Sequence, residues 1–345
     1  MSHSVIELAF LGCGGITRTH SRTLARFRGE VRCHYASRDP ARAAAFAAGH
    51  PGAIAFGSYA EAIADPRIDA VLVATPPDSH LPLVLEALAG GKHVIVEKPA
   101  FLRAADCSRA RTAEARSGRR VLVAENYCYK PLARVLREVL ASGDLGEVRF
   151  VHVDAVKHQR TSGWRADLAS AGGGALFEGG VHWIDLLANL GLHVETVHGF
   201  RPGDWQGGER SMLLVAEYAE GAVGTLAHSW EIPSPFRGLR LSRIYGTRGS
   251  VLFESNGLFV RVTGARPRLV LPGLRDIGGY RAMFRDFLAT IRTGREPLMT
   301  LARAQCGLEL VEAAYRTVPV QAVGRSGGQA VGWTGGRTDF GGIVS

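Results

Sequence analysis

The chain has 345 residues, a length that suits two domains, each large enough to bury its own apolar core. Its hydrophobic content of 46% and charged content of 21% are typical of a soluble globular protein, and no apolar run approaches the roughly 20 residues that span a bilayer. The net charge of +9 arises from basic residues spread along the chain, which favours an anionic small-molecule cofactor over nucleic acid.

The first residues, MSHSVIELAF, lack the basic-then-apolar layout of a signal peptide, so we expect a cytoplasmic protein that is not bound to a membrane. The five cysteines lie far apart and form no CxxC pair. This spacing argues against a disulfide framework and against a metal site, and we expect free thiols. They are Cys13, Cys33, Cys107, Cys128 and Cys306.

Short apolar runs alternate with helical patterns through the first 125 residues. Residues 6–12 (IELAFLG) form a strand that ends at glycine, and residues 16–27 then carry helical spacing. Further strands are expected near 31–36, 53–56, 70–74, 93–96 and 121–124, and helices near 40–48, 58–64, 79–89 and 104–117. This rhythm predicts an α/β fold with a doubly wound parallel sheet, a Rossmann domain over residues 1–125.

The pattern changes after Glu125, and we expect an α+β domain over residues 126–345 with a large open, mainly antiparallel sheet. Long alternating strands, among them a hairpin that turns at Glu220–Gly221, are typical of such a sheet. The expected helices lie at 131–141, 280–293 and 301–316. The tail from Gly324 is rich in Gly, and we expect it to be poorly ordered or dependent on a partner.

A glycine-rich turn follows the first strand. Gly12, Gly14, Gly15 and Ile16 stand there, with Thr17 in place of the third small residue of a dinucleotide fingerprint. Glycine lets the backbone turn sharply and approach a pyrophosphate, which the helix N-terminus attracts. Since the turn joins a strand to a helix in a βαβ series, we assign these residues to cofactor binding.

The end of the second strand reads Ser37-Arg38-Asp39. An acidic residue at this point accepts from a ribose 2′-hydroxyl, whereas arginine suits a 2′-phosphate. Ser37 removes the carboxylate and Arg38 supplies a cation, which favours NADP(H) over NAD(H). The alternative is a surface arginine beside a helix that Asp39 caps.

Several segments together carry a family resemblance. They are ATPPDSH (74–80), GKHVIVEKP (91–99), AENY (124–127), GGGALFEGGVHWID (172–185) and FLATIRTGREP (287–297). In this order the chain resembles the glucose-fructose oxidoreductase, inositol dehydrogenase and rhizopine-catabolism family over roughly residues 5–318. The resemblance implies an NAD(P)-dependent dehydrogenase or reductase for sugars or cyclitols, and a homodimer or homotetramer.

Glu97-Lys98-Pro99 closes a buried strand at the carboxyl edge of the sheet, where open α/β folds place their ligands. The resemblance gives Lys98 the role of positioning or deprotonating a substrate hydroxyl, and we place Glu97 and Lys98 beside the cofactor. The alternative is a lysine paired structurally with Glu97. Pro99 would fix the turn.

Glu178, His182 and Asp185 follow a glycine run at i, i+4 and i+7, which would put all three on one helical face. We assign His182 as general acid/base, with Lys98 orienting the same oxygen and Asp185 accepting from a substrate hydroxyl. The family usually has aspartate at position 178, which leaves open whether Glu178 or His182 touches the substrate. The alternative is a helix that merely buries a satisfied histidine.

Other polar residues carry weaker predictions. Thr75, Pro76 and His80 follow the fourth strand, in a loop that the resemblance places beside the nicotinamide, and Asn126 would bind the carboxamide or the substrate. Lys157, Trp164 and Arg165 are candidates for a substrate wall, since tryptophan stacks on sugar faces. Each of these residues could equally be an ordinary loop or packing residue.

The sequence therefore predicts reversible hydride transfer between NADP(H) and a secondary alcohol or ketone of a sugar, cyclitol or sugar-like metabolite. A first alternative is a redox-neutral glycosidase or isomerase that keeps its nicotinamide and oxidises the sugar transiently. A second alternative is a non-catalytic NADP-binding sensor, which is suggested by the glutamate at position 178 where the family usually has aspartate.

Overall fold

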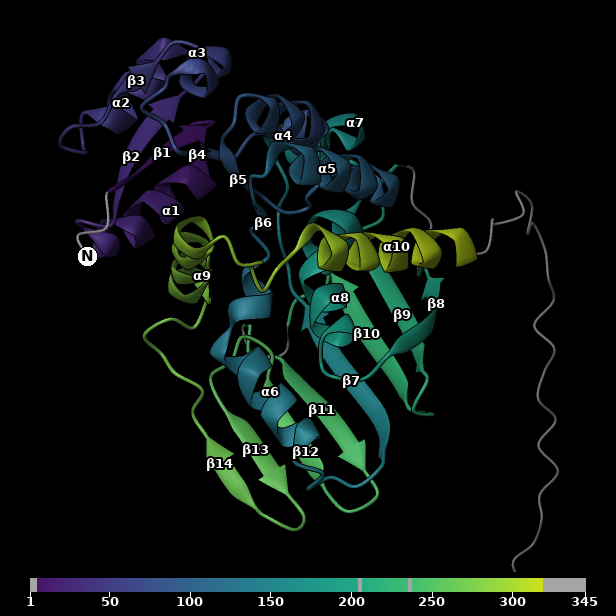
Figure 1. The fold of residues 1–345 in the computed structure, drawn as a ribbon. Coiled ribbons are helices and arrows are strands. Elements are labelled where there is room, and N and C mark those ends of the chain that lie inside the picture. Colours follow the sequence, from purple (N-terminus) through teal and green to yellow (C-terminus); the bar gives the residue numbers. More distant parts are fainter. Residues whose placement is uncertain (1–4, 204–206, 235–237, 319–345) are drawn as a thin grey trace, which may run out of the picture.

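The computed structural model describes residues 5–203, 207–234 and 238–318, and in them the chain forms a six-stranded sheet and an eight-stranded sheet (Figure 1). The glycine-rich tail from Gly324 lies outside the described residues. In this described part of the chain, no helix is both long and apolar enough to cross a membrane. All strands of the first sheet lie before residue 125, and all strands of the second sheet lie after it.

The first sheet is parallel, in the order β3-β2-β1-β4-β5-β6, which confirms the predicted Rossmann topology. Its strands are β1 (Ile6–Leu11), β2 (Val31–Ala36), β3 (Ala55–Phe56), β4 (Ala70–Val73), β5 (His93–Val96) and β6 (Val121–Val123). The helices are α1 (Gly15–Leu24), α2 (Pro40–Ala47), α3 (Tyr59–Ala64), α4 (His80–Ala89) and α5 (Ala104–Ser117). Every residue of β4 and β5 is buried, because helices cover both faces of the sheet.

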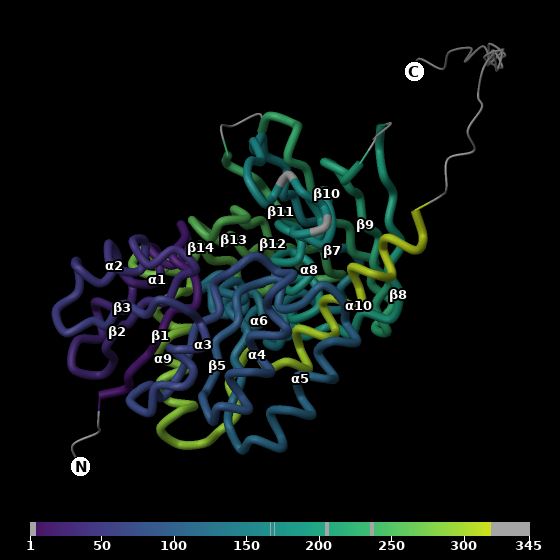
Figure 2. Tube along the Cα trace, turned by 90° about the horizontal axis from the view of Figure 1, so that it is seen from above, coloured from purple at the N-terminus to yellow at the C-terminus, as the bar shows by residue number. Residues whose placement is uncertain are grey.

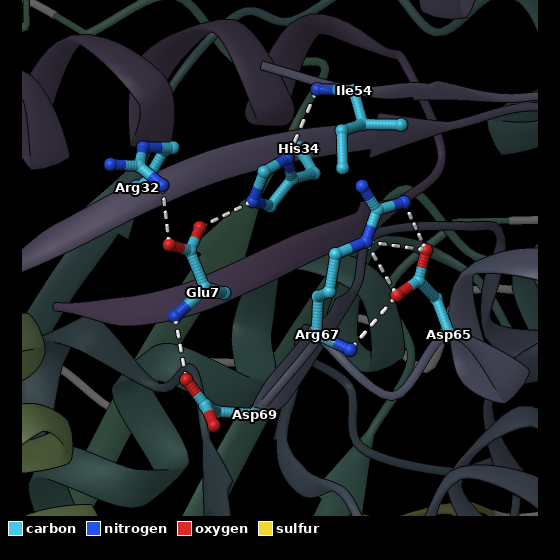
Figure 3. Close-up of polar contacts among 7 residues, drawn as sticks. All are labelled: Glu7, Arg32, His34, Ile54, Asp65, Arg67 and Asp69. Carbon is cyan, nitrogen blue, oxygen red and sulfur yellow. Dashed lines mark hydrogen bonds and ion pairs between the residues drawn. The ribbon is translucent and has the colours of Figure 1, made fainter. Parts of the chain in front are cut away.

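A polar network joins the strands away from their carboxyl ends (Figure 3). Glu7 in β1 accepts hydrogen bonds from Arg32 Nη1 at 2.6 Å and His34 Nε2 at 2.6 Å in β2. His34 Nδ1 accepts from the Ile54 amide at 3.0 Å, so the ring proton lies on Nε2 and donates to Glu7. The Glu7 amide donates to Asp69 ahead of β4. This network fixes the strand register and leaves the opposite, carboxyl edge for ligands.

The second sheet has the order β14-β13-β12-β11-β7-β10-β9-β8, antiparallel except where β7 pairs with β10. The predicted hairpin is confirmed: β9 and β10 are antiparallel and turn at Gly221. The strands are β7 (Val148–Val156), β8 (Val194–Phe200), β9 (Ser211–Tyr218), β10 (Val223–Ser229), β11 (Leu241–Gly246), β12 (Ser250–Glu254), β13 (Val260–Thr263) and β14 (Arg268–Val270).

The last two helices return to the first domain. α9 (Tyr280–Thr293) contacts α1, and α10 (Leu301–Thr317) contacts α5, α8 and β8. Figures 1 and 2 show α10 lying beside α5 of the first domain and near β8 of the second sheet, while α6 (Pro131–Ala141) lies on the second sheet. Helices late in the chain therefore contact elements of both domains.

The glycine-rich segment 172–180 differs from the continuous α-helix that we expected. Leu176–Gly180, labelled η5, forms a π-helical turn, and α8 (Val181–Ala188) follows it. Close packing requires glycine here: a Cβ at Gly174 would lie 2.1 Å from Glu209 Oε2, and one at Gly179 would lie 2.7 Å from the Trp230 ring. A π-turn adds a residue to the helical repeat, and Glu178 in the turn and His182 after it still line one cavity.

Candidate active site

The glycine-rich turn has the geometry of a pyrophosphate cradle. Gly12 has φ +115°, and a Cβ there would lie 2.8 Å from the Ala74 carbonyl oxygen. Gly14 and Gly15 open α1 beside empty space, and Thr17 Oγ1 donates to the Gly12 carbonyl oxygen at 2.7 Å. The first turn of α1, which includes Ile16, contains no acidic residue. The Gly14 amide donates to Thr17 Oγ1 at 3.3 Å, and the positive end of α1 faces a space that suits an anion.

The residues after β2 present cations at the sheet edge. Ser37 is buried and its Oγ accepts from the Asp39 amide at 3.1 Å, whereas Arg38 is exposed. Asp39 caps α2 by accepting from the Ala41 amide, and its other oxygen lies 3.3 Å from Arg42 Nε. The carboxylate in this segment thus serves as a helix cap, as the alternative interpretation allowed, and the exposed Arg38 lies at the sheet edge beside Tyr59.

The loop after β4 is fastened to the loop after β5. Thr75 Oγ1 accepts from Ser79 at 2.7 Å, and Pro76 begins the short turn η2 (Pro77–Ser79). The His80 ring is fully buried, with Nε2 2.9 Å from the Thr75 oxygen and Nδ1 3.0 Å from the Pro99 oxygen. Both ring nitrogens of His80 therefore lie against backbone carbonyls, which gives this histidine a positioning role for the loops.

Glu97 and Lys98 leave β5 in different directions. Glu97 Oε1 lies 2.5 Å from His20 Nε2, and Glu97 Oε2 accepts from the Lys98 amide at 3.1 Å. The Lys98 ammonium instead donates to the backbone oxygen of Glu178 at 2.6 Å and lies 3.6 Å from its Oε1. The Lys98–Pro99 peptide bond is cis. The ammonium of Lys98 thus reaches the second domain rather than pairing with Glu97.

Glu178 holds two cations from inside the π-turn. Its Oε1 accepts from Arg165 Nε at 3.0 Å in addition to the contact with Lys98. Burial raises the pKa of this carboxyl, but Lys98 and Arg165 outweigh burial and bring it to about 2. Glu178 is therefore ionised at neutral pH and acts as an anchor for Lys98 and Arg165.

His182 is held in place by Glu125 and Tyr127. Its Nδ1 lies 2.6 Å from Glu125 Oε1, and its ring stacks on the Tyr127 ring with centroids 4.4 Å apart. Burial, with the nearby Lys98 ammonium, holds the pKa of His182 well below its usual range, and burial raises the pKa of Glu125 to about 7. The sequence reasoning missed Glu125, although its place directly after β6 at the carboxyl edge was a usable signal.

The side chains of Asp185 and Asn126 form hydrogen bonds with other residues of this chain and not with the other predicted site residues. Asp185 is buried one turn beyond His182 and accepts from Asn189 Nδ2 at 2.8 Å. The side-chain amide of Asn126 donates to the Gly278 oxygen at 2.6 Å and so ties the loop ahead of α9. Asp185 does not line the cavity that contains Glu178 and His182, so the structure brings only two of these three residues together there.

A cavity of about 420 Å³ brings Lys98, Glu178 and His182 together with Lys157 and Arg165. The Trp164 ring does not line it and instead packs under the Arg165 guanidinium, 4.5 Å from the ring centroid. Ten lining residues were not predicted, because most lie on strands and loops whose approach depends on the fold of the second sheet. They are Tyr127, Gln159, Arg160, Ser162, Gly179, Trp183, His228, Trp230, Arg240 and Asn256.

Comparison with known proteins identifies the architecture. Residues 6–125 match the oxidoreductase family with an NAD-binding Rossmann fold, and residues 133–252 match the C-terminal domain of the same family, abbreviated GFO/IDH/MocA. The chain belongs to this family. It is therefore an oxidoreductase with an NAD(P)-binding Rossmann domain, which confirms the resemblance that its motifs carry.

Several relatives are similar over most of the chain. An uncharacterized oxidoreductase of Rhizobium meliloti is 31% identical over 75% of this chain and 80% of its own length. A dTDP-3,4-didehydro-2,6-dideoxy-alpha-D-glucose 3-reductase of Saccharopolyspora spinosa is 38% identical over 64% of this chain and 65% of its own. The crystal structure of an aldose-aldose oxidoreductase from Caulobacter crescentus, at 24% identity, shares the fold with a TM-score of 0.81, covering 91% of this chain and 97% of that one.

The residues present fit a nicotinamide dinucleotide. The Gly12 turn and the free N-terminus of α1 suit the pyrophosphate, and a side chain at Gly12 would fill the approach to the β4 loop. β4 and then β5 lie next to β1 in the sheet, so the carboxyl ends of these three strands are neighbours. Lys98, which follows β5, lines the cavity. The bound group would supply the hydride acceptor or donor beside that cavity.

We expect Gly12→Ala to weaken cofactor binding by about tenfold or more, because the added methyl would press against the Ala74 carbonyl in the turn that cradles the pyrophosphate. Titration of protein fluorescence with NADPH measures this. Gly29→Ala is the matched control, since Gly29 also has a positive φ (+84°) but has open space around it. Equal cofactor affinity in the two variants would contradict the assignment.

Proposed function

We propose that this protein is an NADP(H)-dependent oxidoreductase that transfers a hydride between the nicotinamide and a secondary alcohol or ketone of a sugar-like metabolite. The observation that carries the proposal is the convergence of Lys98, from the Rossmann sheet, and His182, from the second domain, on one polar cavity. Trp183 and Trp230 also line that cavity and offer aromatic faces to a polyhydroxylated ring.

His182 is the proposed proton acceptor for alcohol oxidation. It is neutral at pH 7, and when Glu125 is ionised, Nδ1–H donates to its carboxylate and leaves the Nε2 lone pair for a substrate hydroxyl. The hydrogen bond of the His182 ring to a described residue runs through Nδ1, to Glu125. His182 would then accept the hydroxyl proton as the carbon that bears this hydroxyl gives up its hydride to the nicotinamide, and would return the proton in the reverse reaction.

Lys98 is the proposed orienting group for the same oxygen. Two contacts, with the backbone oxygen and the carboxylate of Glu178, fix its ammonium, which has a further donor for the substrate. A cation beside the oxygen stabilises the negative charge that develops when the hydroxyl loses its proton. Glu178 therefore supports the reaction by positioning Lys98, and the longer side chain of glutamate still reaches Lys98 and Arg165 together.

The cofactor preference rests on the segment after β2. Ser37 is neutral, Asp39 is occupied as the cap of α2, and the exposed Arg38 can pair with a 2′-phosphate. An exposed cation without a competing carboxylate at the ribose favours NADP(H), as the sequence indicated.

Replacement of Lys98 by Met should lower kcat/KM by about 10²- to 10⁴-fold, and His182→Ala by a similar factor, because each removes a group that acts on the reacting oxygen. The assay follows absorbance of the reduced nicotinamide with a panel of sugars, cyclitols and keto-sugars. His198→Gln, at an exposed histidine of β8, is the control and should keep the wild-type rate.

Two outcomes of this assay would contradict the proposal. Equal turnover in Lys98→Met and wild type would remove Lys98 from the reaction. Conversion of a sugar with retained cofactor and no net absorbance change would instead support the redox-neutral alternative.

The pH dependence of alcohol oxidation should follow the ionisation of the Glu125 carboxyl. Burial raises the pKa of Glu125 to about 7, while Lys98 and Lys130 lower it and Glu97 raises it. Below that pH the protonated carboxyl donates to His182 Nδ1 and puts the ring proton on Nε2; above it the carboxylate accepts from Nδ1 and frees Nε2 as a base. Alcohol oxidation should therefore rise as the pH rises through about 7.

Glu125→Gln tests this role, because the amide cannot titrate. The kcat/KM profile for oxidation should lose its limb near neutrality, while NADPH affinity stays close to that of the wild type. A variant that retains the same limb would show that another group controls the protonation of His182.

Arg38→Ala should raise the Kd for NADPH by about 10- to 100-fold and change the Kd for NADH little, since only NADPH carries the 2′-phosphate. Fluorescence titration with both cofactors measures the ratio. Arg26→Ala, at an exposed arginine beyond α1, controls for the loss of one positive charge. A parallel loss of affinity for both cofactors would contradict the proposed preference.

A further inference from the structure

The cavity contains more positive charge than hydride transfer requires. Among the described residues that line it, five have cationic side chains and one has a carboxylate. These are Lys98, Lys157, Arg160, Arg165 and Arg240, with Glu178 as the carboxylate. Since Glu178 already pairs with Lys98 and Arg165, the remaining cations line the cavity without a carboxylate partner in the described part of the chain.

Arg240 is the most deeply buried of these unpaired cations, so its desolvation costs the most free energy. It is only 8% exposed, and its one side-chain hydrogen bond to a described residue joins Nη2 to Asn256 Oδ1 at 2.5 Å. Its guanidinium lies over the Trp183 ring, 5.2 Å from the centroid, and Nε has no hydrogen-bond partner among the described residues. A buried guanidinium with an unsatisfied donor is unfavourable unless an anion completes its surroundings.

Lys157 adds a second cation beside Arg240. It follows β7, is half-buried, and its ammonium makes no hydrogen bond or ion pair to a described residue. Burial and then the Arg240 charge lower the pKa of Lys157, and burial with Lys157 lowers the pKa of the neighbouring His228 to about 3. The cavity wall formed by the second domain therefore carries a strong positive potential.

We propose that Lys157 and Arg240, with Arg165 and Arg160 at the exposed side, bind an anionic group of the substrate, a carboxylate or a phosphate. This inference rests on the proposed function, and it narrows the substrate to an acidic sugar or a sugar phosphate. The reacting hydroxyl would lie at Lys98 and His182, and the anion would lie against the cationic wall of the same cavity.

The phosphates of the cofactor do not account for this charge. Their cradle is the Gly12 turn at the start of α1, and the 2′-phosphate cation is Arg38, both in the Rossmann domain. Lys157 and Arg240 flank β7 and β11 of the second sheet, on the substrate side of Lys98. An anion at these two residues therefore belongs to a different molecule from the cofactor.

The experiment compares matched neutral and anionic probes on the NADPH-loaded protein. The Kd values of D-glucose, D-glucuronate and D-glucose 6-phosphate are measured by calorimetry, and the last two probes separate carboxylate from phosphate. We expect at least one anionic probe to bind about tenfold or more tightly than D-glucose, and its affinity to fall with added salt.

Variants assign the effect to the cationic wall. Lys157→Met and Arg240→Met should each raise the Kd of the anionic probe by about 10- to 100-fold and leave the weak binding of D-glucose nearly unchanged. Lys157→Arg keeps the positive charge and should keep most of the affinity for the anionic probe. Arg116→Met, at an exposed arginine of α5, is the control for net charge. NADPH affinity and the thermal midpoint verify folding, and if Arg240→Met does not fold, the two Lys157 variants decide the test.

The results separate this inference from the proposed function. Equal affinity for neutral and anionic probes, or no effect of Lys157→Met, would overturn the anion site even if D-glucose were oxidised with NADP. Charge-dependent binding with no change in nicotinamide absorbance for any probe would support the anion site and contradict hydride transfer. If neither anionic probe binds, the inference is wrong.

Discussion

The contact between the Lys98 ammonium and Glu178 determines how the two domains share one site. Lys98 leaves the carboxyl end of β5 and donates to the backbone oxygen of Glu178 in the π-turn at 2.6 Å, while the Glu178 carboxylate also holds Arg165. Such a partly buried ammonium requires these partners, because desolvation of an unpaired charge is expensive. The π-turn in turn leads directly into α8, which carries His182 to the same cavity. Glu178 therefore connects Lys98 of the first domain to the helix that carries the proposed base His182, whose ring Glu125 and Tyr127 hold.

The charges around this contact have two consequences. Burial and Lys98 keep the His182 ring neutral, so that Glu125 can direct its proton to one nitrogen and leave the other for the substrate. The same positive surroundings extend along the cavity to Lys157 and Arg240, where no carboxylate among the described residues compensates them. The neutral state of the proposed base and the charge of the proposed anion-binding wall thus have the same electrostatic origin.

Local sequence patterns predicted the parts of the site that depend on neighbours in the chain. The Gly12 turn, the strand that ends before Lys98, and the four-residue spacing of Glu178 and His182 could be recognised because a single strand or helix turn places them. The position of Asp185 outside the cavity could not be predicted, since periodicity along one helix does not show which other elements surround the cavity. The π-turn could not be predicted either, since it depends on close packing of glycines against Glu209 and Trp230. The place of Arg240 in the cavity could not be predicted either, because the pairing of β11 with β7 brings it there.

A crystal structure of the protein with NADPH bound would test the central claim most directly. The account predicts that the pyrophosphate lies on the amides of Gly14 and Gly15, and that the reactive carbon of the nicotinamide faces the cavity beside Lys98 and His182. A nicotinamide ring that turns away from this cavity, or is separated from Lys98 and His182 by protein, would contradict the assignment of these two residues to hydride transfer.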